Sequence, residues 1–281
     1  MIQDKLFFFR FNKIKSFPYR FLCAIFLVHA FFCAFTVQAQ HVLQHQIDSL
    51  TSSFNHEFAL LEAASPQGDS TSAKLTGNLI DLTSKLAKSY WMLSYSFSTP
   101  NERKETLEKG IAILEKTKKL KNNELIRGLI SLLEVERLPL IGFEEKFTKI
   151  PLLKSEIQNL VFQYPHQNEG NIAYSLLFQH ISQLNFFERA LAKYWYKVQL
   201  PEPVSPDIEI IFLLQAKVDG AYPAFVHYKL AETYIKLYNF LGIEESLNQV
   251  LSVPNEYPYL DDHYKKLAFD LKAYYKTRGA R

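Results

Sequence analysis

The sequence predicts an all-α fold of stacked antiparallel helical hairpins. After residue 40, apolar residues recur at intervals of three and four almost to the end of the chain, which is the helical period. Prolines separate these periodic runs, and proline is tolerated in the first turn of a helix but not in its interior. Only residues 207–218 (DIEIIFLLQAKV) could also form a strand, and no partner strand is evident. We therefore expect helix to follow helix.

Residues 1–39 have the pattern of a cleaved signal peptide. Basic residues precede an apolar run at 21–37, and Val37-Gln38-Ala39 places small or slim residues at a signal-peptidase site. We expect export through the secretory pathway to a periplasmic or extracellular location, and a single all-helical repeat domain at 40–281. A retained anchor is the alternative, because the run is at the lower length limit for crossing a bilayer. Leu22 and Phe32 precede the two cysteines, so a lipid anchor is not expected.

The composition after residue 39 excludes several functional classes. Both cysteines, Cys23 and Cys33, lie in the leader, so disulfides, thiolate zinc sites and cysteine nucleophiles are not expected. The whole chain has 32 Lys and Arg against 29 Asp and Glu; without the leader's five basic residues and one acidic residue these become 27 and 28. A net charge of −1 gives no reason to expect nucleic acid or a membrane surface as the main partner.

The first half of this region divides into helices and loops as follows. Residues 42–61 are helical by period, residues 64–72 form a polar loop, and the period resumes at 75–98. Thr99 is expected to cap the next helix, with Pro100 in its first turn, Glu102 near its start and lysines near its end. Residues 124–138 form a helix that Pro139 stops, and residues 140–150 are expected to be a packed loop.

The second half continues the pattern. Pro151 is expected to begin a helix that runs to residue 164, followed by helices at 171–185 and 186–200 and a break at 201–206. We interpret residues 207–218 as a buried helix. A helix from Pro223 should end at Gly242, and another should begin at 244 and close at Val253-Pro254. Pro258 should open the last helix.

Two stretches have the spacing of a helical repeat. The first is Tyr174-x2-Leu177-x3-Ile181 followed by Ala190-x3-Tyr194, and the second is His227-x2-Leu230-Ala231-x2-Tyr234 followed by Leu247 and Val250. A weaker third match starts at Tyr90. On these residues the chain resembles tetratricopeptide-repeat proteins, and residues 259–275 look like the extra C-terminal capping helix of that family. Much more weakly, the chain resembles the T component of tripartite ATP-independent periplasmic transporters.

No familiar catalytic motif is present. The sequence lacks a phosphate loop, a dinucleotide glycine pattern, a nucleophile elbow and a His-Glu-x-x-His zinc motif. His41 and His45 are four residues apart but have no third ligand nearby, and Asp261 and Asp262 are explained by the positive end of a helix. We therefore expect no enzyme, no metal and no cofactor.

The resemblance implies a non-enzymatic scaffold that binds a peptide or protein partner. The alternative is a solute-binding accessory component of a periplasmic transport system, which would need an enclosed apolar pocket rather than a long polar groove. In the register of the two repeat matches, one polar face of each first helix would line the groove. Its candidate residues are Ser175, Gln179, Ser182, Gln183, Tyr228, Glu232 and Lys236.

Overall fold

The computed structural model describes residues 40–61, 70–218, 222–257 and 259–279. The chain divides into two units, 1–43 and 44–281, and each is described by itself. In the first unit only residues 40–43 are described, as the start of a helix that extends to residue 61. The predicted signal peptide and most of the predicted loop at 64–72 lie outside the described residues.

The second unit is an all-α helical solenoid, and its described residues include no strand. The helices after residue 61 are α2 (Ser70–Ser94), α3 (Pro100–Leu120), α4 (Glu124–Arg137), α5 (Phe143–Gln163), α6 (Asn168–Gln183), α7 (Phe186–Ala190), α8 (Pro206–Val218), α9 (Pro223–Lys236), α10 (Phe240–Ser252) and α11 (Leu260–Gly279). A short 3₁₀ turn, Leu138–Leu140, follows α4, and a π turn, Leu191–Trp195, continues α7.

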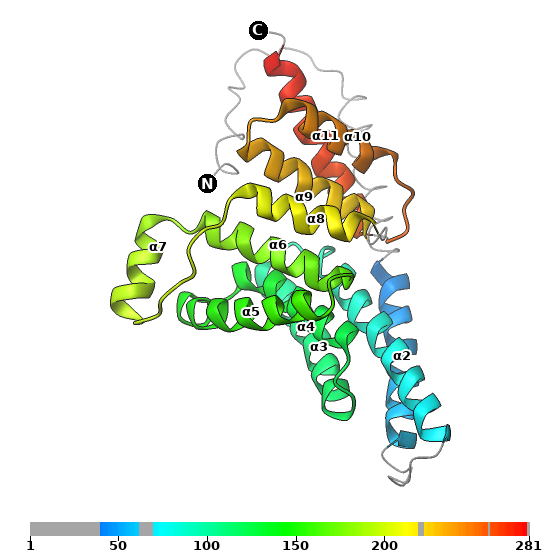
Figure 1. Cartoon of the computed structure of the whole chain (residues 1–281). Helices are drawn as coiled ribbons and strands as arrows, with labels where there is room; N and C mark the ends of the chain where they lie inside the picture. The colour runs from blue at the N-terminus through cyan, green and yellow to red at the C-terminus, as the bar shows by residue number, and fades with distance from the viewer. Residues whose placement is uncertain (1–39, 62–69, 219–221, 258, 280–281) are drawn as a thin grey trace, which may run out of the picture. The chain divides into compact units, whose positions relative to one another are not determined.

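The helices stack as antiparallel pairs: α2 with α3, α4 with α5, α6 with α8, and α9 with α10 (Figure 1). The first helices of the pairs, together with α11, form row A (α2, α4, α6, α9, α11), in which each helix touches the next. The second helices form row B (α3, α5, α8, α10), and each also contacts the next helix of row A. A helical pair cannot bury its apolar face alone, so this stacking supplies the core.

Local signals start and stop several helices as expected. The Thr99 side chain accepts a hydrogen bond from the backbone N–H of Glu102, and Pro100 occupies the first turn of α3. Asn123 caps α4 by accepting from the N–H of Leu125 at 2.8 Å. The final helix is present, and its Tyr264 is buried against α9, which confirms the predicted capping helix.

The loop predicted at residues 140–150 is wrong. α5 begins at Phe143 and runs through Pro151 to Gln163. Proline in a helix interior removes one backbone hydrogen bond and was therefore expected to mark a helix start. The apolar stripe decides otherwise, because Phe147 and Ile150 before the proline and Ile157 after it are all fully buried on one face.

The predicted end of α9 at Gly242 is also wrong. α9 ends at Lys236, and Tyr238 takes the left-handed conformation (φ 55°) that glycine usually supplies after a helix. Asn239 then caps α10 by accepting from the N–H of Gly242, which lies in the first turn of that helix. The sequence therefore contains two signals for a helix boundary here, the cap residue Asn239 and Gly242, and the structure follows Asn239.

Two further expectations change around α6. The predicted hairpin partner of α6 was the segment 186–200, yet α6 pairs with α8, and the intervening helix is short and ends in the π turn. Tyr194, which the first repeat match would place on the packed face of its helix, is exposed. α8 is helical as expected but buried on one face only, since Leu213 and Ala216 are buried and Ile211 is exposed.

The first pair packs against the last helices through an aromatic cluster. Trp91 of α2 lies edge-on to Tyr222 and Phe225 of α9, with ring centroids 4.9 and 5.4 Å away. Tyr95, in the turn directly after α2, contacts Tyr264 of α11 at 5.7 Å. Residues more than 120 positions apart in sequence thus share one core, so α2, α9 and α11 stabilise one another.

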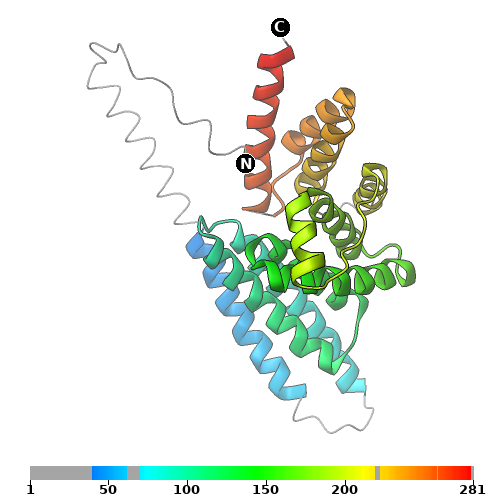
Figure 2. The ribbon, with the colours of Figure 1, turned by 90° about the vertical axis from the view of Figure 1, so that its left-hand side faces the viewer.

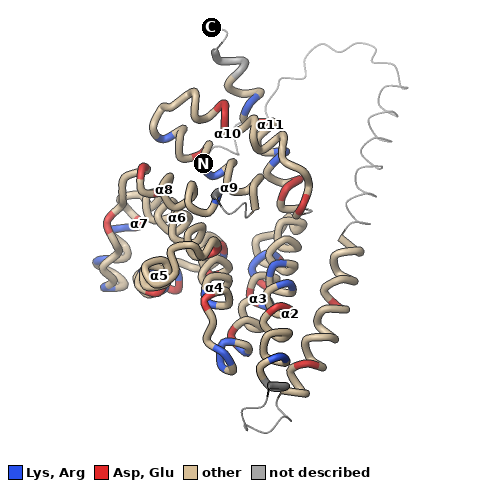
Figure 3. Tube along the Cα trace, turned by 45° about the vertical axis from the view of Figure 1, so that its right-hand side comes forward, with Lys and Arg blue, Asp and Glu red and all other residues tan. Residues whose placement is uncertain are grey.

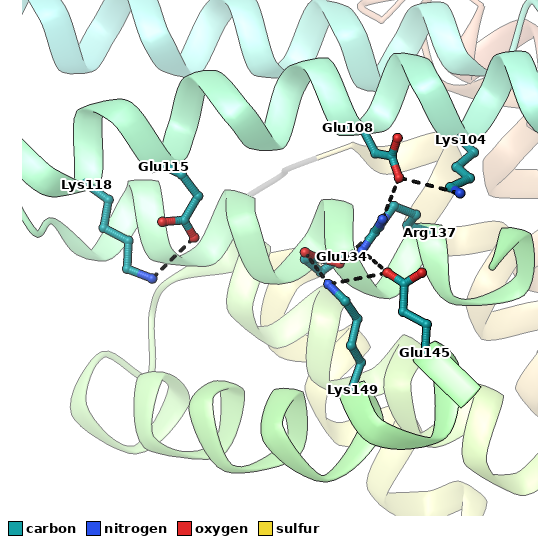
Figure 4. Close-up of polar contacts among 8 residues, drawn as sticks. All are labelled: Lys104, Glu108, Glu115, Lys118, Glu134, Arg137, Glu145 and Lys149. Atoms are coloured by element: carbon teal, nitrogen blue, oxygen red, sulfur yellow. Dashed lines mark hydrogen bonds and ion pairs between the residues drawn. The ribbon is translucent and has the colours of Figure 1, made fainter. Parts of the chain in front are cut away.

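A buried arginine joins α3, α4 and α5 (Figure 4). The Arg137 guanidinium lies 2.6 Å from Glu108, 3.0 Å from Glu134 and 2.8 Å from Glu145. Lys149 adds a second contact to Glu134 at 2.8 Å. Because a buried charge is tolerated only with partners, this network specifies how row B packs on row A here.

We predict that Arg137→Ala lowers the free energy of unfolding by about 3 kcal/mol, because it leaves the half-buried Glu134 with weaker compensation. Glu145→Gln, at the exposed end of the same network, should cost less than about 1 kcal/mol. Urea unfolding followed by circular dichroism measures both. Equal costs for the two variants would show that the buried guanidinium does not organise the network.

Candidate functional site

The structure separates the predicted groove residues by burial. Ser175, Gln179 and Tyr228 are buried, Ser182 and Gln183 are exposed, and Glu232 and Lys236 lie between these extremes. The first three therefore do not line an open face of the described structure. The register of the polar face was derived for a helix with one open side, whereas α6 is covered by α4, α5 and α8.

Several of these residues meet around Glu209, a fully buried carboxylate on α8. Lys236 Nζ lies 2.8 Å from Glu209, and the Thr233 and Ser182 hydroxyls lie 3.4 and 3.5 Å away. The Ser175 hydroxyl donates to the backbone carbonyl of Glu209 at 3.1 Å. Polar groups of α6 and α9 thus compensate one buried charge on α8.

The contacts around Glu209 hold α6, α8 and α9 together. The Gln179 amide donates to Thr233 Oγ1 at 3.1 Å, so α6 and α9 are also linked directly. Sequence reasoning did not select Glu209, although an acidic residue between isoleucines in an apolar segment requires a buried partner. The need of this buried carboxylate for a partner is the feature of the sequence from which the cluster could have been predicted.

A second polar cluster lies at the edge of the aromatic core. Tyr95, directly after α2, donates to Glu136 of α4 at 3.0 Å, and its hydroxyl lies 3.2 Å from that of Tyr264 on α11. Burial raises the pKa of Tyr95 and of Tyr264 well above the ordinary tyrosine value, and burial also raises the pKa of Glu136. The two phenols therefore stay protonated and act as hydrogen-bond donors near neutral pH.

Lys229 of α9 interacts with acidic and aromatic side chains beside this cluster. Its ammonium group lies 2.8 Å from Glu232, and 5.9 and 5.8 Å from the ring centroids of Phe225 and Tyr264. Its charge also lowers the pKa of Glu136, opposing the effect of burial. Two rings and two carboxylates hold this cation in place.

Arg103 of α3 lies on the other side of Tyr95. Its guanidinium is 5.2 Å from the centroid of that ring. Its Nε atom is buried, and no hydrogen-bond partner is present for it among the described residues. Its charge also contributes to lowering the pKa of Glu136.

Two histidines border the same region and are kept neutral. Burial, and then the charges of Lys229, Lys146 and Lys236, lower the pKa of His180 to about 3. Burial, followed by Arg103, Lys229 and Lys266, lowers the pKa of His263 to about 4. The charge of Lys229 contributes to the lowered pKa of both histidines.

We call this region the Lys229 surface. Its members come from α3, α4, α6, α9 and α11, and each is partly exposed: Arg103, Glu136, His180, Lys229, Glu232 and His263. Of the predicted groove residues, only Glu232 belongs to it. The arrangement presents fixed charges of both signs beside aromatic rings, which suits recognition of polar groups on a ligand.

The described ranges show neither a cluster of metal-binding side chains nor a membrane-spanning helix. They contain no group of three or more His, Cys, Asp or Glu side chains that could hold a metal ion. Within the same ranges, no helix is both long and apolar enough to cross a membrane. No family model and no curated protein matches the sequence.

We predict that acid destabilises the protein through His180 and His263. An unfolded histidine takes up a proton near pH 6.5, whereas these two stay neutral to about pH 3 and 4, so stability is lost as the pH falls below about 6.5. Between pH 7 and pH 5 each should contribute a loss of at most about 2 kcal/mol.

The measurement is the melting temperature of the wild type and of the variant His180→Gln/His263→Gln at each pH. The variant should show a smaller drop from pH 7 to pH 5, whatever its stability at pH 7. Parallel curves for the two proteins would show that these histidines do not resist protonation.

Proposed function

We propose that the protein is an exported, non-enzymatic scaffold of the tetratricopeptide-like kind that binds a peptide or a partner protein at the Lys229 surface. The observation that supports this most is the convergence of partly exposed charged groups from α3, α4 and α9 on one region, which the neutral rings of His180 and His263 border. Stacked helical pairs commonly present such extended surfaces to their partners.

The chemistry favours a carboxylate on the partner. The Arg103 and Lys229 cations lie over the rings of Tyr95 and Tyr264, and Arg103 forms no ion pair with a carboxylate among the described residues. A guanidinium with free N–H groups binds carboxylates in a defined geometry. An acidic side chain or a C-terminal carboxylate would therefore bind at Arg103, while Glu136 and Glu232 would accept hydrogen bonds from backbone amides or basic groups of the partner.

Residues that stabilise the fold cannot test this proposal, because replacing them would change stability as well as binding. Tyr228 packs on Tyr264 with ring centroids 5.2 Å apart, and Lys236 neutralises the buried Glu209. Changing Tyr228 to Ala and Lys236 to Glu would therefore damage the fold as well as any binding site. Arg103 and Glu232 are better positions, because the first has no ion pair among the described contacts and the second is only partly buried.

We predict that Arg103→Gln/Glu232→Gln lowers affinity for the partner at least tenfold, which corresponds to about 1.4 kcal/mol. The matched control is Glu105→Gln/Lys116→Gln, which removes the same two charges from exposed positions of α3. Partners are recovered from the exported protein fraction of the native cells, and their affinities are then measured by calorimetry with the purified proteins.

The control should bind as the wild type does, and both variants should keep a melting temperature within a few degrees of it. Equal affinity of the two variants for every recovered partner would remove the Lys229 surface as the binding site.

A further inference from the structure

The segment between α6 and α8 displays four exposed aromatic side chains. Phe186 and Phe187 begin α7 and are 88% and 68% exposed, and Tyr194 and Trp195 end the π turn at 75% and 76%. We call residues 186–197 the aromatic tip. In Figure 1, α7 stands at the left, away from α6 and α8, the two helices that the segment connects, and in Figure 2, viewed from that side, α7 lies toward the viewer. Isolated apolar residues on a surface are normal, but four aromatic ones within ten positions call for an explanation.

The tip is firmly attached at its base. Asn185 and Glu188 form a reciprocal capping box at the start of α7. Arg189 donates to the backbone carbonyl of Ile181 at 2.6 Å, and the Tyr196 ring packs on Phe147 of α5 at 5.9 Å. The exposed rings are therefore carried by an ordered element whose other face is bound to α5 and α6.

The π turn brings the two ends of the tip toward the same side. In an α-helix, residues eight positions apart differ by about 80° around the axis. The wider π turn, closed by the bond from Tyr196 N–H to the Leu191 carbonyl at 3.2 Å, rotates each residue less and reduces that difference. Phe186 and Tyr194, and likewise Phe187 and Trp195, consequently point in similar directions.

The exposed charge of the tip is basic. Lys193 and Lys197 are exposed, and the Lys193 ammonium lies 5.4 Å from the centroid of the Tyr194 ring. Glu188, the acidic residue of the segment, is already engaged by Lys146 at 3.4 Å and by the backbone N–H of Asn185. Figure 3 shows blue segments along α7, with red segments near them.

A second connection at the same end of the stack also exposes apolar side chains. Tyr238, Phe240 and Leu241, at the turn from α9 to α10, are all exposed. The connections from α6 to α8 and from α9 to α10 both lead from row A to row B, so they lie at the same end of the stacked pairs, on the left in Figure 1. That end of the helical stack is rich in aromatic side chains.

We propose that the aromatic tip docks the protein peripherally on an anionic lipid bilayer. Tryptophan and tyrosine with nearby lysines are the residues that favour the membrane–water interface, where the rings lie among the headgroups and the ammonium groups meet lipid phosphates. A bilayer needs no matching pocket, so a protruding element can bind it. The net charge of the chain after the leader gives no reason to expect a membrane as a partner. The tip itself, however, is basic.

The test uses the protein as the cell exports and processes it, with phosphatidylcholine vesicles that do or do not contain phosphatidylglycerol. Vesicles with the anionic lipid should sediment the protein, and Phe186→Ser/Trp195→Ser should reduce binding about tenfold or more. The matched control is Leu152→Ser/Phe162→Ser, which removes two exposed apolar side chains from α5. It should bind as the wild type does.

Tryptophan fluorescence gives an independent readout, because the chain has 2 tryptophans and Trp91 is fully buried. A blue shift on adding anionic vesicles would report Trp195 leaving water, and Trp195→Phe should abolish it. Lys193→Glu/Lys197→Glu should weaken sedimentation, as should high salt.

Three outcomes would overturn the proposal. They are equal sedimentation of the tip variant and the α5 control, equal binding to vesicles without the anionic lipid, and self-association of the wild type that the tip variant abolishes. The last outcome would show that the tip joins two copies of the chain.

Discussion

The packing of α2 against α9 and α11 determines which parts of this protein can face a partner. Trp91 contacts Tyr222 and Phe225, and Tyr95 contacts Tyr264. Each of these rings removes a large apolar area from water. Because the contact joins the first pair to the last helices, it buries side chains of row A that a more open array would leave exposed. The Lys229 surface is the polar border of this contact.

Buried charges explain why the predicted groove and the observed site differ. In an isolated helix, a polar stripe beside an apolar stripe faces water. In this protein, Lys236 instead pairs with the Glu209 carboxylate, which would otherwise be costly to bury, and Ser175 donates to the backbone carbonyl of the same residue. Arg137 behaves similarly with Glu108, Glu134 and Glu145. A polar residue on a helix in a stacked array is therefore ambiguous until its neighbour is known.

The sequence was sufficient for the fold class and for most helix positions, because both depend on local period and on capping. Thr99 and Asn123 cap where such residues should, and the final helix covers α9 and α10. It failed where local signals conflict, as at Pro151 within an apolar stripe and at Gly242 after the cap residue Asn239. These cases were decided by packing.

The candidate site was less predictable, because it depends on contacts between distant segments. Glu136, Lys229 and His263 come from helices that only tertiary packing brings together, and no spacing in the sequence relates them. The predicted residues on α6 and α9 were close in space as expected, since Gln179 bonds to Thr233. Ser175, Gln179 and Tyr228 lie inside the stack instead of on its surface, which periodicity alone could not indicate.

The aromatic tip raises a different question, because the stack does not need it. α6 pairs with α8 directly, and a short turn could connect them as one connects α9 to α10. The segment between them instead forms a capped helix, a π turn and a left-handed residue, Lys197, and these order a surface that buries little of its own aromatic area. Residues that stabilised only the core would point inward, as Tyr196 does toward Phe147. Phe186, Phe187, Tyr194 and Trp195 are therefore better explained by an external apolar environment than by folding.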